Sequence, residues 1–153
     1  MKIVQLSISH GGVPKRAVPE AVVGPLGLEG DEHTDLKWHG GPDRAVCLYS
    51  VEQLTQLVAE GNDVFPGALG ENVTTEGIDF KKLSVGDRLR LGDDVEIEIA
   101  SLVDPCKTIR RYFADGRFAR ISPKTHPDEA RLYARVIHGG RVYAGDRIEI
   151  LRG

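Results

Sequence analysis

Cysteine is scarce in this chain, and the scarcity limits the chemistry that the protein can perform. The 153 residues include 2 cysteines, Cys47 and Cys106. An iron–sulfur cluster needs about four cysteine ligands, so the chain cannot supply a complete set by itself. No secretory signal precedes the cysteines, which predicts a reducing compartment and two free thiols. If the protein performs redox chemistry, we expect a separate protein to deliver the electrons.

The chain also lacks a long hydrophobic run and an excess of positive charge. No apolar run approaches the roughly 20 residues that span a bilayer. The N-terminal residues MKIVQLSISHGG alternate apolar with polar side chains, which predicts a first strand and not a signal peptide. The formal net charge of −3 argues against a nucleic-acid-binding face. We therefore expect a cytoplasmic protein that binds neither membranes nor nucleic acids.

Glycine and proline, by contrast, are plentiful, with 18 and 8 residues dispersed along the chain. This pattern is typical of turns between short strands of one compact domain, which we expect over residues 1–153. Residues 87–92 and 95–101 alternate cleanly around a Gly-Asp-Asp turn and predict a hairpin. Alternation or short apolar runs also predict strands at residues 2–9, 44–49, 132–137 and 147–151.

Helices are predicted at only two places. Ser50 and Gln53 have the spacing of a capping box, and an apolar stripe follows until Gly61 ends the helix. A second short helix is expected after Pro105. Strands outnumber helices and no strand–helix–strand rhythm is visible. The predicted fold is therefore mainly β, a closed or half-closed β-barrel with a few short helical insertions.

Cys106 is the thiol that the sequence marks for chemistry. It follows Pro105 at the start of the second predicted helix, and Lys107, Arg110 and Arg111 come next. Nearby cations lower the pKa of a thiol, and the thiolate is both a nucleophile and a ligand for soft metals. The alternative is a buried cysteine that packs as a small apolar residue. That alternative is the one favoured for Cys47, which lies within the apolar stretch AVCLY.

Two glycine-containing stretches present polar groups. In HGGPDR, Gly40 and Gly41 allow backbone N–H groups to approach an anion, and Arg44 could bind a phosphate. A simple turn with a solvated arginine is the alternative. In PGALGENVTT, residues 66–75, the side chains of Glu71, Asn72 and Thr74 suit a ligand rich in hydrogen-bonding groups. The alternative there is a glycine-rich turn before a strand.

Taken in order, six stretches resemble the MOSC domain, the family named for the C-terminal domain of molybdenum-cofactor sulfurases. They run through nearly the whole chain and indicate a small standalone member of that family. They are GLEGDEH (27–33), WHGGPDRAVCLYS (38–50), FPGALGENVTTEGID (65–79), LSVGDRLRLG (83–92), PCKTI (105–109) and LYARVIHGGRVYAGDRIEI (132–150).

The resemblance implies a barrel-like domain that binds the molybdenum cofactor, an anionic pterin whose dithiolene holds molybdenum. It also implies that Cys106, the cysteine of the stretch DPC, is the catalytic residue and the metal ligand. The cofactor-binding residues expected on this basis are Asp31, His33, His39, Gly40, Gly41, Arg44, Glu71, Asn72, Thr74, Lys107 and Arg110.

Three functions remain open on the sequence. The resemblance favours a molybdenum-dependent reductase of N-hydroxylated compounds, such as hydroxylamino-purines, that receives electrons from a separate flavin or iron–sulfur protein. The alternative is a non-catalytic carrier of the cofactor or of persulfide sulfur on Cys106. A zinc hydrolase using His33, His39 and Glu71 is a third possibility, although the histidine spacing matches no common zinc motif. Cofactor sulfuration is not expected, because the chain has no aminotransferase-like domain. The sequence leaves the oligomeric state open.

Overall fold

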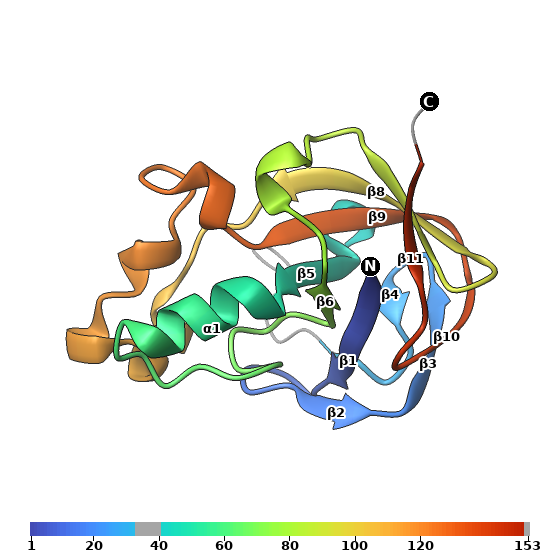
Figure 1. Cartoon of the computed structure of the whole chain (residues 1–153). Helices are drawn as coiled ribbons and strands as arrows, with labels where there is room; N and C mark the ends of the chain where they lie inside the picture. The colour runs from blue at the N-terminus through green and yellow to red at the C-terminus, as the bar shows by residue number, and fades with distance from the viewer. Residues whose placement is uncertain (33–40, 152–153) are drawn as a thin grey trace.

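The computed structural model describes residues 1–32 and 41–151 of the chain, and its strands form two sheets (Figure 1). The larger sheet contains β1 (Lys2–Ile8), β2 (Arg16–Val18), β5 (Val46–Ser50), β6 (Val73–Glu76), β7 (Arg88–Leu91), β8 (Val95–Leu102), β9 (Leu132–His138) and β11 (Ile148–Leu151). The smaller sheet contains β3 (Glu20–Gly24), β4 (Gly27–Leu28) and β10 (Gly140–Tyr143). The strand orders are β11-β7-β8-β9-β5-β6-β1-β2 and β10-β3-β4.

The prediction of a mainly β protein is confirmed, whereas the prediction of a barrel is not. Among the described residues, neither sheet closes on itself. The start of β1 approaches the turn before β11 through one isolated bridge, between Lys2 and Arg147. Three backbone hydrogen bonds accompany it, from Ile3 N to Asp146 O and from Gly145 N to Ile3 O at 2.8 Å, and from Ile148 N to Met1 O at 2.9 Å. Because this approach is a bridge and not a ladder, the architecture is that of two open sheets.

The hairpin predicted for residues 87–101 is present. β7 and β8 are antiparallel with Leu91 opposite Val95. Buried and partly exposed residues alternate along both strands, as expected when one face of a sheet packs on the core. The predicted strands at the N-terminus and near the C-terminus correspond to β1, β9 and β11.

Two features of the topology differ from the prediction. β10 lies within residues 138–146, which separate the predicted strands at 132–137 and 147–151 and were expected only to connect them. It pairs with β3. β5 and β6 are parallel neighbours joined through the helix α1 (Val51–Ala59), so the chain does contain a strand–helix–strand unit. The expectation of none was wrong because residues 60–72 form a long connection that separates the helix from its second strand. Because of that connection, the strand–helix–strand order is not recognisable in the sequence.

The predicted helix after Ser50 is α1. Ser50 Oγ accepts a hydrogen bond from Gln53 N at 3.0 Å, and Leu54 and Leu57 are buried. Gly61 follows the helix with φ of 102°, a conformation that glycine adopts without strain. With nine residues, α1 is short, and no helix in the described ranges is long and apolar enough to cross a membrane.

Short 3₁₀ helices make up the rest of the helical structure in the described residues. The predicted helix after Pro105 is η3 (Lys107–Tyr112). The others are η1 (Pro42–Arg44), η2 (Phe80–Lys82), η4 (Ala114–Gly116), η5 (Phe118–Ile121) and η6 (Pro127–Glu129). In Figure 1, η3, η4 and η5 lie beyond the free end of α1, on the side away from the smaller sheet.

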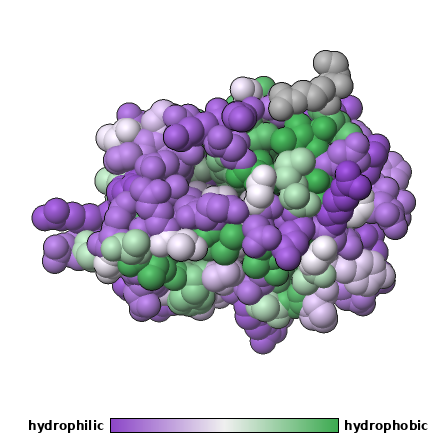
Figure 2. All heavy atoms as spheres, viewed as in Figure 1, coloured by the Kyte–Doolittle hydropathy of each residue, from purple (hydrophilic) through white to green (hydrophobic). Residues whose placement is uncertain are grey.

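The apolar residues form two clusters. One lies between the sheets and includes Ile3, Leu6, Leu48 and Ile97, all with no exposed surface. The other lies between α1, the connection after it and η3 to η5, and is centred on residues such as Leu57, Leu69, Ile109 and Ile121. Figure 2 shows that hydrophilic side chains cover most of the outer face in that view. The second cluster holds the segment containing Cys106 against the larger sheet.

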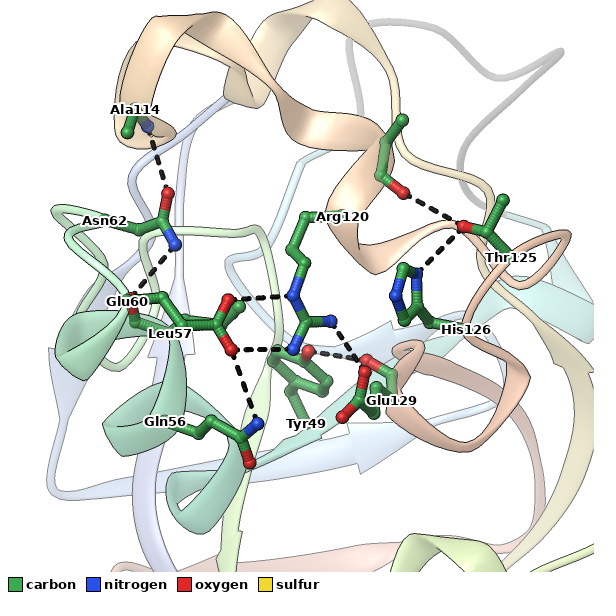
Figure 3. A network of polar contacts seen from close by, with 11 residues as sticks. Tyr49, Gln56, Leu57, Glu60, Asn62, Ala114, Arg120, Thr125, His126 and Glu129 are labelled. Atoms are coloured by element: carbon green, nitrogen blue, oxygen red, sulfur yellow. Dashed lines mark hydrogen bonds and ion pairs between the residues drawn. The ribbon is translucent and has the colours of Figure 1, made fainter.

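A network of polar contacts also stabilises the helical segments around the second cluster (Figure 3). Arg120 on η5 donates to both carboxylate oxygens of Glu60 after α1, at 2.8 and 2.9 Å. Its third nitrogen donates to Glu129 Oε2 on η6 at 2.6 Å. Tyr49 Oη also donates to the backbone carbonyl of Glu129, at 2.6 Å. One guanidinium therefore connects the end of α1 to η5 and η6, which come about sixty residues later in the sequence.

Candidate functional site

One pocket brings together most of the chemistry-bearing residues that the structure describes. Five segments and the acidic residue Glu32 contribute to its walls. The lining residues of these segments are Gly12, Val13 and Lys15; Arg44 and Cys47; Leu69, Gly70 and Asn72; Cys106, Thr108 and Ile109; and Arg131 and Tyr133. These segments are the loop before β2, the start of β5, the loop before β6, the start of η3 and the start of β9. The two cysteines, which are far apart in sequence, both line this pocket.

Cys106 lies at the entrance to η3 and is partly exposed. β8 ends at Leu102, and the buried Ile109 anchors η3 in the second apolar cluster. Cys106 Sγ lies 2.8 Å from Thr108 Oγ1, within hydrogen-bonding distance. A hydroxyl at that distance can orient the sulfur lone pairs. The sulfur is thus accessible from the pocket and held in place, as a metal ligand or a nucleophile needs to be.

Cys47 is buried, as the sequence indicated, but it is also part of the pocket wall. It is 5% exposed and lies on β5, whose five residues are all buried. Burial raises the pKa of the Cys47 thiol to about 11, although the positive charges of Arg131 and Lys15 oppose this effect. At neutral pH Cys47 is therefore a neutral thiol, a weaker nucleophile than a thiolate.

A buried network of polar side chains supports the pocket from below. Lys15 Nζ donates to Asp31 Oδ2 at 2.7 Å, and both side chains are at least nine-tenths buried. Asn72 Nδ2 donates to the same oxygen at 2.8 Å, and Asn72 Oδ1 accepts from Cys47 N at 3.0 Å. Ser9 N donates to Asp31 Oδ1 at 3.0 Å. The network joins the loop before β2 to β5 and to the loop before β6.

Glu71 and Thr74, both predicted to contact a cofactor, are completely buried and do not line the pocket. Burial raises the pKa of Glu71, although backbone N–H groups of Gly67 and Leu69 and the charge of Arg131 act in the opposite direction. Thr74 Oγ1 lies 3.4 Å from Glu71 Oε2. In this position Glu71 organises the loop that precedes β6.

The start of β9 contributes two pocket residues that sequence reasoning missed, Arg131 and Tyr133. They are two positions apart, so their side chains point to the same face of an extended chain. Arg131 is 6% exposed, and its Nη1 donates to Leu69 O at 2.6 Å. Burial, followed by the nearby Cys47, raises the pKa of the Tyr133 hydroxyl well above its usual range. The sequence offered one signal for this site, an arginine directly before an apolar predicted strand.

The remaining predicted residues divide into three groups. Arg44 lines the pocket, and Gly41 caps η1 next to it with φ of 86°. Lys107 and Arg110 are exposed on η3 and do not contribute to the pocket walls. The residues that lie outside the described part of the chain are His33, His39 and Gly40.

A metal site built only from protein ligands is not evident in residues 1–32 and 41–151. No group of three or more histidine, cysteine, aspartate or glutamate side chains is placed to hold a metal ion there. Within those ranges the pocket instead combines one accessible sulfur, Cys106, with the cationic side chains of Lys15, Arg44 and Arg131. Of these cations, Lys15 is already paired with Asp31, so Arg44 and Arg131 are the cationic groups that do not share this ion pair.

Several known proteins are similar to this chain in sequence. The chain is 34% identical to the Escherichia coli protein YiiM over 137 residues, which are 86% of this chain and 59% of YiiM. It is 31% identical to the uncharacterised Bacillus subtilis protein YflK, covering 92% of this chain and 63% of YflK. The chain thus spans about 60% of the length of these curated relatives. A Gibberella moniliformis protein named a reductase is 33% identical over 82% of this chain, which corresponds to 22% of that protein.

The fold is also similar to a solved structure. The crystal structure of Escherichia coli YiiM superposes with a TM-score of 0.72 at 25% sequence identity, covering all of this chain and 71% of that one. The family model described as the MOSC domain matches residues 35–149, a range that includes Cys106 and most of the pocket segments. The chain therefore belongs to the MOSC domain family.

Proposed function

We propose that this protein binds the molybdenum cofactor, with Cys106 as the protein ligand of the metal, and reduces N-hydroxylated compounds. The observation that carries the proposal is the pocket itself, which places an accessible sulfur among three cationic side chains. Membership of the MOSC family and a relative named a reductase support it. When bound, the cofactor would supply a molybdenum centre that changes oxidation state and accepts the oxygen of an N–OH group.

The residues present fit such a group. Thiolate sulfur is a ligand that soft metal centres prefer, and Cys106 is the partly exposed thiol of the two. Arg44 and Arg131 bring positive charge to the walls that would face an anionic pterin, whereas the charge of Lys15 is paired with Asp31. Arg131 has a buried Nε without a hydrogen-bond partner, which a ligand oxygen could satisfy. A pocket built for a neutral apolar ligand would not need these groups.

Each side chain has a role that follows from its position. Thr108 fixes the orientation of the Cys106 sulfur through the 2.8 Å contact. The network of Lys15, Asp31 and Asn72 holds the pocket walls at a fixed separation. The raised pKa of Tyr133 keeps its hydroxyl protonated at neutral pH, so it can donate a hydrogen bond into the pocket. The electrons would come from a separate flavin or iron–sulfur protein.

The test is cofactor content and turnover. Wild type, Cys106→Ala and Thr55→Ala are produced in a host that makes the cofactor, and molybdenum and pterin are measured in each. Thr55 is an exposed residue of α1 outside the pocket and serves as the control. We expect stoichiometric molybdenum and reduction of a hydroxylamino-purine with an artificial reductant in wild type and the control. Cys106→Ala is expected to lose turnover and the spectroscopic signature of sulfur ligation.

Two results would change the proposal. Unchanged metal content and spectroscopy in Cys106→Ala would show that this sulfur is not the ligand. Full molybdenum occupancy without turnover of any N-hydroxylated compound would favour the alternative function, a carrier of the cofactor or of persulfide sulfur on Cys106.

A further inference from the structure

Arg131 is a buried cation whose charge the described residues do not neutralise. Its side chain is 6% exposed, yet no carboxylate of residues 1–32 and 41–151 lies within ion-pair distance of it. Its Nη1 hydrogen bond goes to a neutral backbone carbonyl, that of Leu69. Its Nε is buried without a hydrogen-bond partner. Guanidinium N–H groups donate and cannot accept, so what is missing is an acceptor, preferably an anionic one.

The buried acidic group Glu71 does not supply the missing charge. Glu71 is close enough for the charge of Arg131 to affect its pKa, but the two form no ion pair. Burial raises the pKa of Glu71 and so favours its neutral form. The Cys47 thiol, which also feels the charge of Arg131, is neutral at pH 7 because its pKa is about 11. The protein groups around Arg131 therefore leave its positive charge unbalanced.

The location of Arg131 shows where the balancing group would come from. Arg131 lines the same pocket as Cys106. Arg44 adds a second guanidinium to the walls, whereas the charge of Lys15 is balanced by Asp31. A planar guanidinium presents paired N–H groups that match the oxygens of carboxylates and phosphates. Tyr133, two residues further along the same face, places a second kind of donor on this wall.

We infer that Arg131 forms an oxyanion-binding subsite beside Cys106, which holds a carboxylate-, phosphate- or sulfate-like group of the ligand. The subsite itself does not require the proposed function. Its assignment to the cofactor or to the substrate does rest on that function, because either molecule could carry the oxyanion. The experiments below use inorganic sulfate as the probe and separate the two sources.

The first experiment uses protein from a host that cannot make the cofactor. Its melting temperature is measured against sulfate concentration, with chloride at matched ionic strength as the reference. A ligand that binds the native state raises the melting temperature by mass action. We expect a saturable rise in wild type, and a Kd for sulfate weakened by about tenfold or more in Arg131→Gln. Arg141→Gln is the control, because Arg141 is an exposed residue of the smaller sheet outside the pocket.

A purely structural role for Arg131 gives a different pattern. Arg131→Gln would then melt at a lower temperature and still respond to sulfate as wild type does, which would overturn the subsite. The absence of any specific sulfate response in wild type would overturn it as well. Arg131→Lys is the second variant in case the glutamine variant does not fold. It keeps the positive charge without the paired donors and is expected to bind sulfate more weakly than wild type.

A second readout needs no substitution at Arg131. Iodoacetate carries a carboxylate and alkylates thiols, whereas iodoacetamide is neutral. If the subsite lies beside Cys106, sulfate should slow alkylation of Cys106 by iodoacetate more than alkylation by iodoacetamide, at constant ionic strength. Peptide mass spectrometry distinguishes Cys106 from Cys47. Equal effects of sulfate on the two reagents would contradict an anion site next to this sulfur.

Cofactor-loaded protein identifies the source of the oxyanion. If the cofactor supplies it, loading abolishes the sulfate response and Arg131→Gln lowers molybdenum content. If the substrate supplies it, loaded protein still responds and sulfate competes with the N-hydroxylated substrate. Either outcome supports the subsite. If wild type carries neither molybdenum nor pterin, the proposed function fails, while the results on unloaded protein still decide the subsite.

Discussion

Cys47 and Tyr133 are register partners on the antiparallel strands β5 and β9, and both side chains line the pocket that contains Cys106. Residues directly opposite each other on neighbouring strands present their side chains to the same face. The pairing brings a buried thiol and a protonated phenol to one wall, with the accessible thiol on another segment. The two cysteines therefore share a site but differ in chemistry, since one is buried and the other is partly exposed.

The buried Cys47 thiol predicts a loss of stability at alkaline pH. Burial raises its pKa from 9.0 to about 11, so the folded protein retains this proton at pH values where the unfolded chain releases it. The resulting stabilisation is complete below pH 9 and is lost as the pH rises to 11, a change of about 2–3 kcal/mol. The unfolding free energy of wild type relative to Cys47→Ala should fall by about that amount between pH 8 and 11.

Urea denaturation of both proteins across this range is the measurement. The comparison with Cys47→Ala removes the contribution of Tyr49, whose pKa burial also raises. It removes that of Tyr133 only in part, because burial and then Cys47 itself raise the pKa of that hydroxyl. A difference that does not change with pH would show that the Cys47 thiol ionises as easily in the folded protein as in the unfolded chain.

Gly67 is predicted to be essential for packing the loop before β6 against the backbone of Lys15. It has φ of 90°, and a Cβ at this position would lie 2.2 Å from the backbone oxygen of Lys15. Gly67→Ala should therefore lower the unfolding free energy by about 3 kcal/mol or more, because backbone has to move. Gly61→Ala is the matched control. Gly61 also has positive φ, of 102°, but nothing lies within 4 Å of the added Cβ.

The control should lose only the strain of the left-handed conformation, about 1 kcal/mol. Equal losses in the two variants would mean that the loop containing Gly67 yields without cost. Urea denaturation at neutral pH distinguishes the two results.

The buried pair of Lys15 and Asp31 predicts strong coupling between substitutions. Lys15→Met or Asp31→Asn alone leaves one buried charge without its partner and should cost about 3 kcal/mol or more. The double variant should lose less than the sum of the two, by about 1–3 kcal/mol. A double-mutant cycle of unfolding free energies measures this coupling.

The exposed pair of Lys2 and Glu76 serves as the reference cycle. Its side chains are 55% and 50% exposed and 3.6 Å apart, so we expect a coupling of about 0.5 kcal/mol or less. If both cycles give similar couplings, the burial of Lys15 and Asp31 does not strengthen their interaction.

Arg120 is predicted to stabilise the helical segments beside the pocket. Arg120→Met removes three hydrogen bonds to Glu60 and Glu129, which should lower the unfolding free energy by about 1–2 kcal/mol after allowance for partial exposure. Arg117→Met, at an exposed position three residues earlier, is the control and should change little.

The effect of Arg120→Met should depend on pH. The hydrogen bond from Arg120 lowers the pKa of Glu60, so its contribution is present above the ordinary glutamate pKa of about 4.3 and disappears as the pH falls further. Denaturation at pH 7 and pH 3.5 measures this. An undiminished difference between wild type and variant at pH 3.5 would exclude the ionised Glu60 as the partner that matters.

Local sequence signals determined several of the elements and indicated which of the two thiols is buried. Alternation of apolar and polar residues specifies β7 and β8, and the run of apolar residues from Val46 specifies a strand buried on both faces, because burial sets which positions must be apolar. Ser50 and Gly61 determine where α1 begins and ends, since helix termini need an acceptor and a positive φ. The stretch DPCKTI marked Cys106 because thiol reactivity depends on its immediate neighbours.

Only the tertiary structure decided how these pieces meet. β5 and β6 are parallel neighbours although a long connection separates α1 from β6. β10 pairs with β3, which lies more than a hundred residues earlier in the chain. Such pairings depend on non-local packing. The same packing placed Arg131 and Tyr133 in the pocket and withdrew Glu71 and Thr74 into the interior. Whether a polar side chain faces a ligand or the core depends on the register and crossing of distant strands. A sequence read locally carries no record of that geometry, which is why the role that we propose for Arg131 emerged only from the fold.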